Sequence, residues 1–149
     1  MANHLRRQIR EALATAVTGL ATTGSRVFQS RVYPLETADL PGLLVFTLTE
    51  SSERVTFPAP GLMQRVLRLQ VVGIASAVSD LDDTLDQICK EVEIALAMPC
   101  TALAGIAKTI TLISTDVEMQ GTSSRPVGQA AMTFEIVYMA AENAPDVGY

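Results

Sequence analysis

Apolar residues recur along this chain at two spacings, one typical of helices and one typical of strands. Between residues 3 and 20 they recur every three or four positions, which predicts an amphipathic helix with Asn3 as its N-cap. The same spacing in residues 79–99, "SDLDDTLDQICKEVEIALAMP", predicts a second helix. Ser79 and Asp82 there form an acidic version of a capping box at its start.

Apolar and polar residues alternate in the segments between and after these helices, which predicts strands. The predicted strands are residues 26–33, 42–50, 63–77, 109–120 and 129–140. In the second of them, Leu44, Phe46 and Leu48 are expected on one face and the residues between them on the other. Residues 51–61 are polar and then proline-rich, which predicts an extended loop. The turn-rich "GTSSRPVG" between the last two strands predicts a hairpin connection.

Length and composition favour one globular domain. The chain has 149 residues, of which 48% are hydrophobic and 18% charged. We expect a single domain over residues 1–141 and a flexible end at residues 142–149. No apolar run reaches the roughly 20 residues that cross a bilayer, so no membrane partner is expected. Residues 12–21 loosely resemble the core of a signal peptide, but helical periodicity explains them better.

The charge balance argues against a surface that grips nucleic acid. The formal net charge is −5, aromatic residues make up 5% of the chain, and tryptophan is absent. Affinity for phosphates depends on lysine and arginine, so no specific nucleic-acid binding is expected. Cys89 and Cys100 form no cluster of the kind that binds a metal, and both are expected to be reduced thiols.

The sequence also offers little catalytic chemistry. His4, the single histidine, falls in the first turn of a predicted helix, where we expect an exposed side chain rather than a catalytic base. Asp80, Asp82, Asp86 and Glu91 have the spacing of a calcium loop, but a helix would point these carboxylates in different directions. No phosphate-binding or dinucleotide-binding motif is present. We therefore expect no metal, no cofactor and no enzymatic activity.

The order of the predicted elements resembles a known family. The predicted elements follow one another in a set order: a helix, a short strand, "YPLETADLPGLLVFTLTE", a polar loop, a long strand, a helix opening "SDLDDTLDQI" and a final strand "AAMTFEIVYMA". This order resembles the tail terminator proteins of long-tailed bacteriophages, the minor tail protein U family of lambda-like phages. The resemblance runs from about His4 to Ala140. It departs from the family at residues 51–61 and after Ala140.

The resemblance implies a fold, a function and partners. The implied fold is α+β, with two main helices packed on one face of a mixed or antiparallel sheet of four to five strands. The implied function is that of a ring, hexameric in the family, which caps the tail tube, stops its polymerisation and provides the surface that joins the head. Its partners would be further copies of the chain, the major tail tube protein and a head-completion or neck protein. Its location would be the head–tail junction of the virion, after assembly in the host cytoplasm.

Ring closure requires two different patches on each subunit, and projecting loops could supply them. The candidate subunit and tail interface is formed by Ser51, Ser52, Glu53, Arg54, Gly121, Thr122, Ser123, Ser124 and Arg125. Two alternatives stay open: another head–tail connector or neck subunit, and a small bacterial ligand-binding regulatory domain of α+β class. For the latter, Arg65 and Arg68 are the available anion anchors, but strand alternation places them on opposite faces.

Overall fold

A computed structural model describes residues 2–29, 35–77, 79–97, 103–120 and 126–149. The described part of the chain contains two α-helices, one short 3₁₀ helix and five strands. In chain order these elements are α1 (Leu5–Ala16), β1 (Val27–Gln29), η1 (Thr37–Asp39), β2 (Gly42–Arg54), β3 (Leu62–Ser76), α2 (Leu81–Leu96), β4 (Thr109–Gln120) and β5 (Val127–Ala141).

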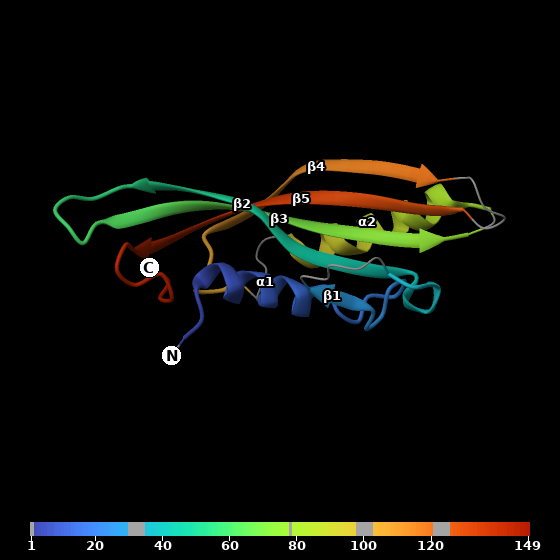
Figure 1. Ribbon diagram of the computed structural model, residues 1–149, viewed down its shortest axis with the longest axis horizontal. Helices are drawn as coiled ribbons and strands as arrows, with labels where there is room; N and C mark the ends of the chain where they lie inside the picture. The colour runs from blue at the N-terminus through green and yellow to red at the C-terminus, as the bar shows by residue number, and fades with distance from the viewer. Residues whose placement is uncertain (1, 30–34, 78, 98–102, 121–125) are drawn as a thin grey trace.

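The five strands form one mixed sheet in the order β1-β2-β3-β5-β4. β1 runs parallel to β2, and the other neighbouring pairs are antiparallel. α1 packs against β1 and β2, while α2 packs against β3 and β5 and touches α1. Both helices therefore cover the same face of the sheet (Figure 1).

The core lies between this face and the helices. Alternate residues of β3 point into it and are fully buried, as Leu67 and Leu69 illustrate. Gly73 lies in the same row of inward-facing residues. A Cβ atom at this position would lie 2.6 Å from the side chain of Ile88 on α2. The missing side chain lets the helix approach the middle of the sheet, so glycine at this strand position is a packing requirement.

The predicted balance between helices and sheet was wrong. The fold is α+β, with two helices and a five-stranded mixed sheet. The prediction of two main helices packed on a sheet of four to five strands implied a smaller share of strand residues than the structure has. Strands make up 46% and helices 24% of the described residues. β2 and β3 continue as a paired hairpin past both helices (Figure 1). The polar residues 51–54 carry no apolar alternation, yet they pair with β3, because a backbone ladder does not require apolar side chains.

A β-bulge reverses the side-chain alternation of β2. Thr47 pairs with Leu69 and Thr49 pairs with Arg68, so Leu48 is an extra residue in the ladder. Beyond the bulge Glu50 pairs with Leu67 and lies on the helix-covered face. A regular strand would have placed Glu50 on the opposite face.

The helix ends also differ from the prediction. α1 begins at Leu5, and its N-cap is His4 rather than Asn3. α2 begins after Asp80, which has a left-handed backbone (φ 57°) and makes no capping hydrogen bond through its side chain. The predicted capping box at Ser79 was therefore wrong. The prediction of a single domain over residues 1–141 with a flexible end stays a prediction.

Candidate assembly surfaces

The part of the sheet that projects beyond the helices forms an arm, defined here as residues 51–66 (Figure 1). Its tip, residues 55–61, joins β2 to β3 and carries two exposed apolar side chains, Val55 and Phe57. Phe57 is 81% exposed, and the guanidinium of Arg54 lies 5.4 Å from its ring centroid. An aromatic ring this exposed at the end of a projection is available for contact with another molecule.

The tip is attached to the end of the chain through Glu142. Its carboxylate accepts a hydrogen bond from Arg54 Nη2 at 2.5 Å and another from the Gly61 backbone N–H at 2.9 Å. Arg54 is the last residue of β2 and Gly61 directly precedes β3, so the two bonds join both sides of the hairpin to Glu142. They hold Arg54 in place beside Phe57, so the tip has a defined shape.

At the root of the arm, Glu50 joins four elements. We call Glu50, Tyr138, Arg65, Arg6 and His4 the anchor cluster. The Glu50 side chain is 8% exposed and accepts hydrogen bonds from the Tyr138 hydroxyl at 2.5 Å, Arg6 Nη1 at 3.1 Å and Arg65 Nη1 at 3.4 Å. A nearly buried carboxylate needs such partners, because leaving it unpaired costs several kcal/mol. The cluster fixes the direction in which the arm leaves the body.

His4 belongs to this cluster, so the expectation of an exposed, unengaged side chain was wrong. Its Nδ1 accepts a hydrogen bond from the Arg6 backbone N–H at 3.1 Å, and its Nε2 lies 3.4 Å from Arg65 Nη1. Partial burial, reinforced by the positive charge of Arg6, lowers the pKa of His4 below its ordinary value. Burial, together with the hydrogen bond to Glu50, raises the pKa of Tyr138. The tyrosine is therefore a permanent hydrogen-bond donor near neutral pH.

β4 forms a long, exposed edge of the sheet. It pairs with β5 on one side, and on the other side no strand of the described residues pairs with it. Ile113, Val117 and Met119 on this strand are each 43% to 51% exposed. An edge strand presents unpaired N–H and C=O groups that can bind a strand of another chain. β4 is therefore a second candidate contact surface, separate from the arm.

The structure places one half of the predicted interface. Ser51, Ser52, Glu53 and Arg54 lie on β2 within the arm, on a paired strand rather than a loop. The other predicted residues, Gly121, Thr122, Ser123, Ser124 and Arg125, lie outside the described residues. Sequence reasoning missed Phe57, although an aromatic residue among prolines in a polar segment is a signal that could have found it.

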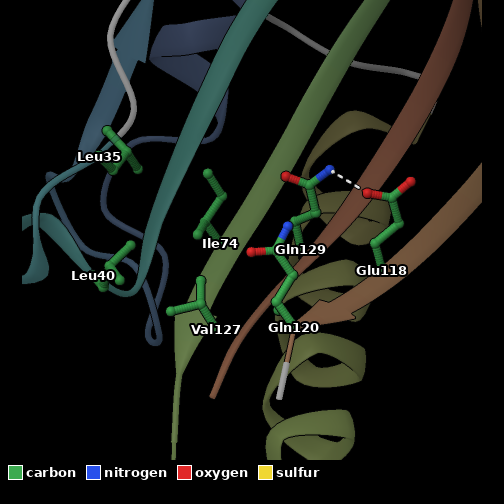
Figure 2. A pocket seen from close by; sticks show the side chains of 8 residues that line it. Leu35, Leu40, Ile74, Glu118, Gln120, Val127 and Gln129 are labelled. Carbon is green, nitrogen blue, oxygen red and sulfur yellow. Dashed lines mark hydrogen bonds between the residues drawn. The ribbon is translucent and has the colours of Figure 1, made fainter. Parts of the chain in front are cut away.

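A shallow cavity lies at the end of the sheet away from the arm, where β3 ends and β5 begins (Figure 2). Its volume is about 230 Å³. Leu35 and Leu40, from the segment before β2, lie on one side, and polar side chains of β4 and β5 lie on the other. The lining residues are Leu35, Leu40, Ile74, Glu118, Gln120, Val127, Gly128 and Gln129. The volume is below the roughly 300–1,000 Å³ of sites that enclose a small molecule.

Glu91, one of the acidic residues of α2, connects this helix to the turn after α1. Glu91 accepts hydrogen bonds from the backbone N–H and hydroxyl of Thr22, at 2.9 and 2.5 Å, which ties α2 to the turn after α1. Burial opposes ionisation of Glu91, but the hydrogen bonds from Thr22 outweigh it and lower its pKa. Within the described ranges no group of three or more His, Cys, Asp or Glu side chains is placed to hold a metal ion.

Two further predictions can be checked. The placement of Arg65 and Arg68 on opposite faces is confirmed. Arg65 pairs with Glu50 on the helix-covered face. On the other face, Arg68 Nη2 lies 3.6 Å from Glu135 Oε2. Cys89 is a free thiol, and burial, followed by the charge of Glu93, raises its pKa. Among the described helices none has the length and apolar character to span a membrane.

Comparison with known proteins assigns no family to this chain. No family model and no curated protein matches it. A chain in a structure of the virion of a native gene transfer agent particle is similar, with 15% sequence identity and a TM-score of 0.43, over 90% of this chain and 92% of that chain.

Proposed function

We propose that this protein is a structural subunit of a phage or prophage tail, and that it acts as a ring-forming tail terminator. Such a ring would cap the tail tube, stop its polymerisation and provide the surface that joins the head. The proposal rests on the resemblance in element order described above, and on the surfaces that the fold exposes. The same surfaces support a structural role.

The observation that carries the proposal is the pairing of a projecting arm with a separate exposed edge strand. The arm ends in exposed Phe57, and β4 presents apolar side chains along an edge to which no strand of the described residues pairs. A ring of identical subunits needs two unlike patches on each subunit, because each copy meets the next through a heterologous contact. Its partners would be further copies of itself, the major tail tube protein and a neck protein.

The charge of the chain suits this role. With a formal net charge of −5, the subunit would repel the phosphates of DNA that passes through a ring. Weak attraction would leave the DNA free to move. An electrostatic map of the assembled ring with a strongly basic channel would contradict this part of the proposal.

Two other functions compete with this one. A different head–tail connector would bind the portal complex rather than the tail tube, and pull-downs against each complex separate the two. A small ligand-binding domain would need an enclosed pocket with convergent polar groups. The cavity of about 230 Å³ is small for this purpose, and Arg65 is engaged in the anchor cluster.

The test is deletion of the gene in the phage or prophage that encodes this chain. We expect lysates with tail tubes of uncontrolled length that do not join heads, visible by negative-stain electron microscopy. Expression of the chain from a plasmid should restore tails of uniform length. Normal, head-joined tails in the deletion lysate would contradict the proposal.

A further inference from the structure

The tip of the arm and the cavity at the far end of the sheet match one another in size and chemistry. The tip presents the ring of Phe57 with the guanidinium of Arg54 over its face. The cavity has an apolar floor, which includes Ile74 and Val127, and a carboxylate at its side, Glu118 (Figure 2). An aromatic ring accompanied by a positive charge is the kind of group that such a cavity accommodates.

Volume supports the match. The cavity measures about 230 Å³. Protein cavities of roughly 150 Å³ lined by leucine, isoleucine and phenylalanine bind benzene. There is thus room for the phenyl ring of Phe57. Its insertion would bury an apolar side chain that is 81% exposed in a single copy.

Charge supports it as well. Glu118 accepts one hydrogen bond, from Gln129 Nε2 at 3.3 Å, and a carboxylate can accept several. Arg54 donates through Nη2 to Glu142, and a guanidinium has five N–H groups. An Arg54–Glu118 contact between copies can therefore form without breaking the bond that holds the tip in shape.

The tip cannot reach the cavity of its own chain. Leu62, at the tip end of β3, and Ile74, in the cavity, are twelve residues apart on one continuous strand. At about 3.3 Å per residue this separates them by roughly 40 Å. Because the tip and the cavity lie at opposite ends of the sheet, any contact between them joins two copies head to tail.

We propose that the arm tip of one copy docks in this cavity of a second copy, with Phe57 on the apolar floor and Arg54 beside Glu118. The inference deepens the ring-forming role proposed above by naming the two patches that meet. It predicts a contact of the heterologous kind, which extends from copy to copy until the arrangement closes.

Cross-linking with a short bis-maleimide tests the contact. In a background with Cys89→Ser and Cys100→Ser, cysteines are introduced as Val55→Cys, which leaves the docking ring of Phe57 in place, and Val127→Cys, both at exposed positions. A chain that carries both should give a ladder of covalent multimers on a denaturing gel. Two chains that carry one cysteine each should give mixed dimers and nothing longer, because each has a single reactive thiol.

The matched control replaces Val127→Cys with Ile94→Cys, an exposed position on α2. The 55–127 product should form about ten times faster than the 55–94 product, as a contact preference of one order of magnitude implies. Adding Glu118→Arg should remove most of this difference. Equal rates for the two pairs would overturn the docking contact.

A second measurement does not depend on the cysteine background. The photoreactive residue in Phe57→p-benzoylphenylalanine should cross-link to residues 35–40, 118–120 or 126–129 of a second copy, identified by mass spectrometry. Cross-links that map elsewhere, or their absence at high protein concentration, would overturn the inference. The deletion phenotype is independent of both assays, so failure of the docking contact and failure of the terminator role can be told apart.

Discussion

The hydroxyl of Tyr138 on β5 donates a hydrogen bond to the carboxylate of Glu50 on β2, across the intervening strand β3. The two residues are 88 positions apart in the chain. Tyr138 is fully buried, and the Glu50 side chain is 8% exposed. This contact lies at the root of the arm, so its strength bears on both the stability of the fold and the direction of the arm.

Replacing Tyr138→Phe removes the donor and leaves the Glu50 carboxylate with one partner fewer. We expect the free energy of unfolding to fall by about 1.5–3 kcal/mol, as is typical for a hydrogen bond to a charged group. Urea unfolding followed by circular dichroism measures the change. The matched control, Tyr149→Phe at a 74% exposed position, should have no effect. Equal losses in the two variants would contradict the role of the hydroxyl.

Replacing Glu50→Ala removes the negative charge that faces Arg65 and Arg6. The Arg65 side chain is 14% exposed, so its charge would be left nearly buried without its carboxylate. We expect a loss of about 3–5 kcal/mol, the usual result of breaking a buried pair from one side. Glu11→Ala, which breaks the exposed pair with Arg7, should cost less than about 1 kcal/mol in the same assay. A loss at Glu50 no larger than at Glu11 would show that the cluster contributes nothing to stability.

Replacing Gly73→Ala places a methyl group 2.6 Å from Ile88 Cγ2. We expect a loss of about 1–3 kcal/mol in unfolding free energy from overpacking between β3 and α2. Adding Ile88→Ala vacates the contested space. In a double-mutant cycle the two changes should therefore cost less together than the sum of their separate effects. Additive effects would mean that Ile88 does not limit the space at residue 73.

The stability of the protein should depend on the charge state of His4. The folded-state pKa of His4 is below its ordinary value of 6.5, so folding favours the neutral ring. Its contribution is therefore present above pH 6.5 and is lost as the pH falls through the folded-state pKa. Protonation also removes the ring nitrogen that accepts the capping hydrogen bond of α1. The charges of Arg6 and Arg65 disfavour the protonated ring, whereas those of Glu50 and Asp146 favour it.

His4→Asn tests this dependence, because asparagine caps a helix without titrating in this range. Urea unfolding at about pH 7.5 and about pH 5.5 brackets the ordinary titration of histidine. We expect the wild-type chain to lose more stability than the variant between the two conditions. Equal losses in both proteins would show that His4 does not contribute to the pH dependence.

The periodic segments were predicted well because their apolar spacing is local information. β4 has the predicted bounds, and β3 and α2 lie within one to three residues of theirs. The helix caps were predicted wrongly, because a cap depends on the conformation of one or two residues. Asp80, for example, has the left-handed backbone that no property of the sequence pattern indicates. Residues 51–54 were misassigned for a different reason, since polar strand residues paired within an arm do not alternate with apolar ones.

The sequence by itself determined where the main periodic helices and strands lie, and it carries none of the catalytic motifs considered above. Tertiary structure alone decided where Glu50 points. The bulge at Leu48 turns that carboxylate towards the helix-covered face, where Tyr138, Arg65 and Arg6 meet it. A bulge shifts the register of two paired strands, and its position depends on the partner strand. For this reason the anchor cluster and the arm that it holds could be recognised only once β2, β3 and β5 lay side by side.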